Sequence, residues 1–229
     1  MNTQPATPYA LPSLWSWVLG VPLGGAVILV GLWLFAAQLG PGYYGSIGFA
    51  IGWFTLAWIA IGRVGKRVPA LSMPLRAVYL AIVLVVGGYS AWTTFTDKTV
   101  NEQIAVGAPS SASGGAGGNV ELSRGPFVGV AHGASGTAAV VKVASGEHLL
   151  TFSALDTDNG PDLRVYLVAG AASGDGDVDD FVDLGALKGN KGNQQYAIPA
   201  DTDLERYATV VIWCRAFSVS FAKAELATS

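Results

Sequence analysis

The pattern of hydrophobic residues divides the chain into two parts. Up to residue 95 the apolar residues form long, nearly unbroken stretches, whereas from residue 120 onward short apolar runs alternate with Gly, Pro, Asn and Asp. Long runs are typical of membrane-spanning helices, and short punctuated runs are typical of strands. We therefore expect a mixed fold, in which an N-terminal three-helix transmembrane region precedes a C-terminal all-β antiparallel sandwich or jelly roll.

Three apolar segments are close to the ~20 residues that a helix needs to cross about 30 Å of hydrocarbon. The first is too long for a cleaved signal peptide and lacks its basic start. Some glycines in the first two spans either pack helices closely or are merely tolerated, namely Gly20, Gly24, Gly25, Gly48 and Gly52. We predict membrane spans at residues 14–37, 43–62 and 77–95, within an anchor of residues 1–95 and with a tight turn at residues 38–42.

Charge indicates the orientation of this anchor. No Asp, Glu, Lys or Arg occurs before Arg63, and the next charged residues, Lys66, Arg67 and Arg76, are also basic. Basic loops are retained in the cytoplasm, so we expect a cytoplasmic N-terminus and an extracytoplasmic C-terminal domain in a multi-pass cell-membrane protein. All acidic residues fall from Asp97 onward, where they outnumber Lys and Arg. This balance argues against a nucleic-acid partner, and spans without acids or His argue for a lipid-bilayer anchor over a transporter.

Residues 96–119 show no apolar periodicity and become rich in Gly, Ser and Ala. We predict a flexible extracytoplasmic linker, because such a composition cannot bury enough apolar surface to order itself. A chain of about 20 mobile residues has a typical reach of roughly 25 Å.

Residues 120–229 carry strand-like runs separated by turn residues and no convincing helical periodicity. About 110 residues of this kind suit a β-sandwich with a single core. We predict strands at residues 125–131, 136–143, 148–154, 163–169, 181–184, 194–198, 208–214 and 217–226.

Several short motifs in this domain resemble the DM13 family, a small module related in outline to the DOMON-like β-sandwiches, which include haem and sugar binders. The motifs are Gly125-Pro-Phe127, His132-Gly-Ala-Ser-Gly136, Gly160-Pro-Asp-Leu-Arg-Val-Tyr-Leu167, Leu184-Gly-Ala-Leu-Lys-Gly189, Gln194-Gln-Tyr-Ala-Ile-Pro199, Leu204-Glu-Arg-Tyr207 and Val210-Val-Ile-Trp-Cys-Arg-Ala-Phe217. They span nearly the whole domain, and such domains are often tethered to membranes. The resemblance implies electron transfer or oxidative modification at cell surfaces.

Cys214 is the only cysteine, so no disulfide can form within the chain. It ends an unbroken apolar run that predicts a strand near the core. By the resemblance it matches the family's cysteine, which implies a redox thiol or a ligand to a group such as haem, and His132 matches the family's histidine. His148 is another candidate ligand. Free cysteines are also often small core residues, and this interpretation remains open.

Other chemistries lack their motifs. A type-one copper site needs two His with the Cys, but no His follows Cys214 and the domain has no Met, so we predict no metal site. Covalent haem attachment lacks Cys-x-x-Cys-His. The acidic stretch 175–183 lacks the Gly and Glu of an EF-hand. No hydrolase or transferase motif is present, and whether the protein is an enzyme stays open.

The leading hypothesis is a membrane-anchored extracytoplasmic protein with a redox or electron-transfer role centred on Cys214. Its partner would be an unidentified membrane or cell-surface redox protein. The alternative is a non-catalytic cell-surface adhesion or ligand-binding β-sandwich in which Cys214 fills the core. A thiol bordering a polar pocket would favour the first, and a thiol enclosed by apolar side chains would favour the second.

Overall fold

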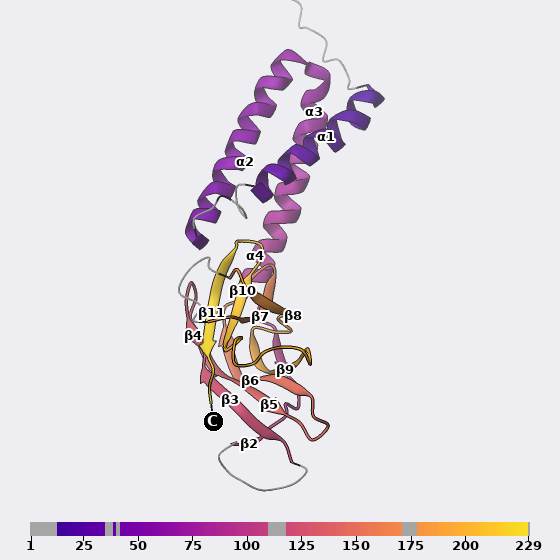
Figure 1. The fold of residues 1–229 in the computed structure, drawn as a ribbon. Coiled ribbons are helices and arrows are strands. Elements are labelled where there is room, and N and C mark those ends of the chain that lie inside the picture. Colours follow the sequence, from indigo (N-terminus) through magenta and orange to yellow (C-terminus); the bar gives the residue numbers. More distant parts are fainter. Residues whose placement is uncertain (1–12, 35–38, 40–41, 110–117, 171–177, 229) are drawn as a thin grey trace, which may run out of the picture. The chain divides into compact units, whose positions relative to one another are not determined.

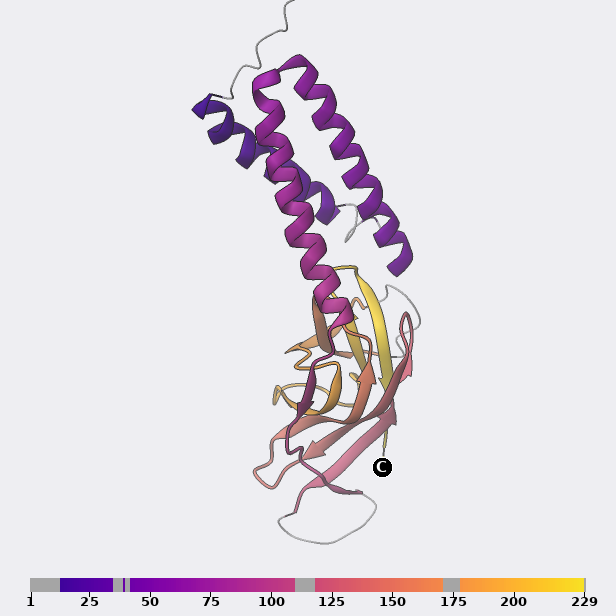
Figure 2. The same cartoon turned by 180° about the vertical axis from the view of Figure 1, so that it is seen from behind.

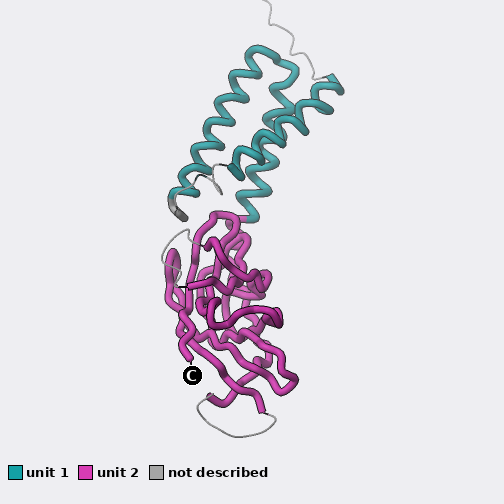
Figure 3. The backbone as a smooth tube through the Cα atoms, in the orientation of Figure 1, with its two compact units in different colours: residues 1–89 teal, residues 90–229 magenta. Residues whose placement is uncertain are grey.

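The computed structural model describes residues 13–34, 39, 42–109, 118–170 and 178–228, without the side chains of residues 42–44. The chain divides into two compact units, Met1–Tyr89 and Ser90–Ser229 (Figure 3). We call them the helical unit and the β unit.

The helical unit contains three helices that are long and apolar enough to cross a membrane, over Leu14–Leu32, Gly45–Arg67 and Pro69–Phe95. The last of these includes a π-helical turn and continues into the β unit's range. The elements are α1 (Leu14–Leu32), α2 (Gly42–Arg67), α3 (Pro69–Ile82), η2 (Val83–Gly87) and α4 (Gly88–Phe95), drawn from indigo to magenta in Figure 1. Residues 35–38 of the predicted first span, and most of the predicted turn after it, lie outside the described residues.

The predicted basic loop over residues 63–76 is helical in the structure. Arg63, Lys66 and Arg67 lie in the last turns of α2, and α3 begins at Pro69 after a single non-helical residue, Val68. Lys and Arg are good helix formers, and proline is well tolerated in the first helical turn. The apolar pattern therefore identifies the apolar part of each span, but it does not predict where the helices end.

Small residues of α1 pack closely on α3. A Cβ added at Gly20 would meet Leu71 at 3.3 Å, and one at Gly24 would meet Leu75 at 2.6 Å. Gly48 and Gly52 of α2, in contrast, have open space around them. The close-packing interpretation thus holds for the glycines of α1, and simple tolerance holds for those two of α2.

The β unit contains two mostly antiparallel sheets (Figures 1 and 2). The larger runs β1-β9-β6-β5-β3-β12, with β2 also on β3, and the smaller runs β4-β11-β10-β7-β8. The strands are β1 (Thr99–Asn101), β2 (Ala108–Pro109), β3 (Val120–Pro126), β4 (Val128–Gly129), β5 (Ala134–Lys142), β6 (His148–Thr157), β7 (Leu163–Val168), β8 (Phe181–Ala186), β9 (Lys191–Ile198), β10 (Thr209–Cys214), β11 (Val219–Glu225) and β12 (Ala227–Thr228).

Aromatic side chains fill the core of the β unit. Phe152 of β6 is fully buried and lies edge-on to Phe127, with ring centroids 4.9 Å apart, and Tyr196 of β9 packs at 5.5 Å from it. Strands β6, β7 and β10 supply many of the remaining fully buried residues. Strands β7 and β10 of the smaller sheet are buried at almost every position, so both faces of that sheet are covered there.

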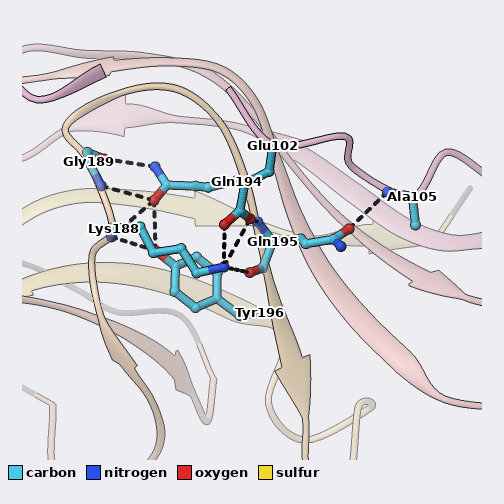
Figure 4. A network of polar contacts seen from close by, with 7 residues as sticks. All are labelled: Glu102, Ala105, Lys188, Gly189, Gln194, Gln195 and Tyr196. Atoms are coloured by element: carbon cyan, nitrogen blue, oxygen red, sulfur yellow. Dashed lines mark hydrogen bonds and ion pairs between the residues drawn. The ribbon is translucent and has the colours of Figure 1, made fainter. Parts of the chain in front are cut away.

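Residues 96–109 differ from the flexible linker that the sequence predicted. Strand β1 pairs in parallel with β9, and β2 pairs in parallel with β3. Glu102 reaches Lys188 at 2.8 Å and accepts a hydrogen bond from the Gln195 backbone, as Figure 4 shows. The Lys188 ammonium, as hydrogen-bond donor, lowers the pKa of the Glu102 carboxyl. These partners are about ninety residues away in the chain, so no local sequence pattern predicts the contacts. The rest of the predicted linker includes residues 110–117, which lie outside the described residues.

Candidate functional site

Cys214 is the last residue of β10, in the smaller sheet. Its Cα partners are Leu163 on β7 and Val219 on β11, and all three residues are buried. Side chains alternate along a strand, so the thiol lies on the same face as Ile212 and opposite to Trp213. The expectation of a thiol at or near the core is confirmed: Cys214 is a free cysteine with 0% exposure.

Burial controls the protonation state of this thiol. Loss of hydration raises the pKa of Cys214 from 9.0 to about 11, although nearby backbone amides of Phe217, Asp162 and Ala216 act against this shift. The thiolate is the reactive form of cysteine in nucleophilic attack and metal binding. At neutral pH the side chain is therefore a protonated thiol without access to solvent, which is unsuited to attack on a disulfide.

The opposite face of the same strands carries a stack of aromatic rings. The rings of Tyr166 and Phe181 lie 4.2 Å apart, at 19° to each other, and Trp213 lies 6.5 Å from Tyr166 at 25°. Tyr166 is buried, Trp213 is half-buried and Phe181 is 40% exposed. We call these three residues the aromatic stack. It leads from the residue next to Cys214 to the protein surface.

An ion-pair network borders the end of β10. Asp162 contacts Arg215 at 2.8 Å and Arg164 at 3.0 Å, and Arg164 also lies 3.8 Å from Asp183. The Arg215 backbone donates a hydrogen bond to the Asp162 carbonyl, which fixes the turn after Cys214. Arg215 is thus engaged with a carboxylate. This agrees with the alternation rule, which directs it away from the thiol.

His132 lies between β4 and β5. Its Nδ1 is 2.9 Å from Asp158, its ring stacks on Phe221 with centroids 4.0 Å apart, and its Nε2 is buried. His148 begins β6 in the other sheet, opposite Ile198. His132 thus packs on β11 of the smaller sheet and His148 lies in the larger sheet, and a ligand role for either histidine stays a prediction.

The arrangement around Cys214 does not fit a haem. A thiolate ligand must be deprotonated and must face a cavity, whereas this thiol is protonated and enclosed between strands. Within the described ranges, no three His, Cys, Asp or Glu side chains gather as a metal site. Of the acidic stretch, residues 175–177 lie outside the description, and Asp180 bonds to Arg206 and Tyr207.

Sequence reasoning singled out Cys214 and His132 but missed Tyr166 and Phe181. These two become neighbours only through the register of β7 with β8 and β10, where Tyr166 lies opposite Val211. The available signal was the alternation in β10, which places Trp213 and Val211 on one face. An apolar strand covered on both faces gave no reason to expect a surface-reaching stack.

Comparison with known families gives one match. Residues 126–226 match the family model described as Electron transfer DM13. The match includes Cys214, the aromatic stack and the Asp162 network. No curated protein and no solved structure matches the chain.

Proposed function

We propose that this chain, in which residues 126–226 form a DM13 domain, is a membrane-anchored electron-transfer protein with Cys214 as its redox residue. The family description supports electron transfer in general. The role of Cys214 rests on one observation: the thiol is adjacent in the chain to Trp213, from which the aromatic stack leads to the exposed edge of Phe181.

The chemistry that suits this site is the exchange of single electrons. A buried neutral thiol cannot act as a nucleophile, but electrons can pass through the oxidisable rings of Trp213 and Tyr166. In the oxidising direction, Cys214 loses one electron through the aromatic stack to a strongly oxidising one-electron acceptor on the partner, such as a high-valent haem. Its proton passes to water through local opening at the end of β10, which leaves a thiyl radical. A reduced carrier of the same class and a proton from water restore the thiol. The partner is an unidentified redox protein of the membrane or the cell surface.

The reaction of the full chain with a one-electron oxidant in detergent tests electron transfer from Cys214 through the aromatic stack. We expect hexachloroiridate(IV), a coloured one-electron oxidant, to be consumed in a fast phase that disappears in Cys214→Ala. Trp213→Phe should slow this phase, because phenylalanine keeps the packing but is much harder to oxidise. Trp92→Phe is the matched control, since Trp92 is 69% exposed and lies outside the stack, and it should leave the phase unchanged. A fast phase that survives in Cys214→Ala would rule out the proposed centre.

The proposed location has the DM13 domain on the extracytoplasmic side. Support comes from the basic residues at the junction of α2 and α3 and from the three candidate spans among the described residues, since the third span leads away from that junction. Lys66 is the only lysine before residue 98, and Lys142 is exposed on the β unit. A membrane-impermeant amine reagent should therefore label Lys142 but not Lys66 in cells or spheroplasts with an intact inner membrane. Permeabilised cells should show both labels, and the reverse pattern in intact cells would invert the topology.

The second candidate function is a non-catalytic adhesion or ligand-binding module. The complete burial of Cys214 favours it, because small core cysteines have this environment. In this case Cys214→Ala would alter stability alone, and the oxidant would react at the same rate with both proteins. The oxidant experiment thus separates the two candidates.

A further inference from the structure

A cavity of about 520 Å³ lies between α1 and α2. This volume is within the roughly 300–1,000 Å³ typical of ligand pockets. Its walls are almost entirely apolar, with one charged residue. The lining residues are Leu23, Gly24, Val27 and Ile28 of α1, Trp53, Leu56, Ala57, Ala60, Ile61, Arg63 and Val64 of α2, and Leu75 of α3.

The cavity exists because small residues on α2 face α1. Ala57 and Ala60 leave the space between the two helices unfilled, while α1 and α2 each pack on α3. Trp53 closes one end: its indole N–H donates to the Ile28 carbonyl at 2.9 Å, and its ring occupies the space where a side chain at Gly31 would be. The cavity is therefore a blind apolar groove that ends at Trp53.

The other end of the groove is positively charged. Arg63 lines the cavity, and its side chain is exposed. Lys66 and Arg67 follow in the last turn of α2, and no acidic residue precedes Asp97 anywhere in the sequence. Arg63 thus has no carboxylate on its own unit to neutralise it. A ligand that matches this groove has an apolar tail and an anionic head.

The length of the groove identifies the source of such a ligand. Trp53 and Arg63 are ten residues apart on α2, which corresponds to about 15 Å along the helix. This is half of the ~30 Å hydrocarbon thickness, or the depth of one leaflet. We propose that the groove binds one anionic phospholipid of the cytoplasmic leaflet, with an acyl chain against Ala57 and Ala60 and the phosphate group at Arg63.

The site rests on the proposed membrane insertion but not on the role of Cys214. A guanidinium binds a lipid phosphate through paired hydrogen bonds. Because no carboxylate on this unit neutralises Arg63, a headgroup with a net negative charge is favoured over a zwitterionic one. The acyl chain fills space that the helices leave open and thereby joins α1 to α2. The lipid is a structural ligand in this proposal and carries no electrons.

Quenching of tryptophan fluorescence tests the site in the full chain. The protein is placed in nanodiscs that contain equal amounts of phosphatidylglycerol and phosphatidylcholine, with bromine on the acyl chains of one lipid at a time. Trp53→Phe defines the part of the signal that comes from Trp53. We expect brominated phosphatidylglycerol to quench this part more strongly than brominated phosphatidylcholine.

Variants distinguish a built site from a general attraction of basic residues for acidic lipids. Arg63→Gln should abolish the preference, so that both lipids quench equally, whereas the matched control Arg67→Gln, which lies outside the cavity, should retain it. Ala60→Phe should reduce quenching by both lipids because it fills the groove. Equal quenching in the native protein, equal effects of the two arginine variants, or displacement of the lipid by a co-purified quinone would each overturn the proposal. Failure of the chain to insert into nanodiscs would instead contradict the membrane anchor, and Cys214→Ala should give native quenching.

Discussion

Replacement of Gln194 by alanine is expected to lower the free energy of unfolding of the β unit by about 3 kcal/mol or more, because each buried polar group that loses its partner costs about 1–3 kcal/mol. Gln194 is fully buried in β9. Its amide oxygen accepts from the Gly189 backbone at 3.2 Å and from the Tyr196 hydroxyl at 2.8 Å, and its amide nitrogen donates to the Gly189 carbonyl at 2.8 Å. Alanine would remove the partner of the Gly189 backbone N–H and C=O, and the Tyr196 hydroxyl would keep only its bond from the Lys188 backbone N–H (Figure 4).

Gln195 provides the matched control for this substitution. It is the next residue and the same type, but it is only half-buried, and its side-chain oxygen accepts a hydrogen bond from the Ala105 backbone at 2.9 Å. Gln195→Ala should cost about 0.5–1.5 kcal/mol, the usual net value of one hydrogen bond. Urea unfolding of the full chain in detergent, with hydrogen exchange of the β9 amides, measures both. Equal losses would show that Gln194 does not organise this network.

The second large effect concerns the reduction potential of Cys214. Because the thiol is protonated below its pKa of about 11, its one-electron oxidation releases one proton. Raising the pH therefore favours the oxidised form, and the potential should fall by about 59 mV per pH unit up to about pH 11. Above that pH the reduced form is already a thiolate, so the potential should become constant.

Substitution of Asp162 should shift the pH at which the potential stops falling. Its negative charge raises the pKa of the Cys214 thiol, so Asp162→Asn should move the end of the sloping region to lower pH. The loss of its ion pair also frees the positive charge of Arg215, which acts in the same direction. Voltammetry of the full chain across this pH range measures both positions. A potential that does not depend on pH would contradict proton-coupled oxidation of a buried thiol.

Much of the fold was predictable from the sequence for identifiable reasons. The three apolar runs predicted three candidate membrane helices, because an uncharged apolar stretch of about 20 residues has the length of a membrane-spanning helix. Alternation and turn residues predicted the strands from β5 to β11, with small differences at their ends. Helix limits near Arg63 and Val68 were not predictable, because the residues beyond the apolar run also form good helices.

The features that the sequence did not predict depend on long-range partners. Residues 96–109 are held in place by Lys188, Asn190 and Lys191. These residues are distant in the chain and contact Glu102 and Asp97 only in the folded structure. The aromatic stack likewise depends on three strands in register. Cys214 was predicted near the core from its own strand alone, but its partners Leu163 and Val219 are set by the order of the strands in the sheet.

The most direct test of the account is voltammetry at neutral pH on the full chain and on Cys214→Ala, both adsorbed in lipid. The account predicts a one-electron wave in the native protein that is absent from Cys214→Ala, while the two proteins have the same strand content by circular dichroism. A wave of equal size in both proteins, or no wave in the native protein, would contradict Cys214 as the redox centre.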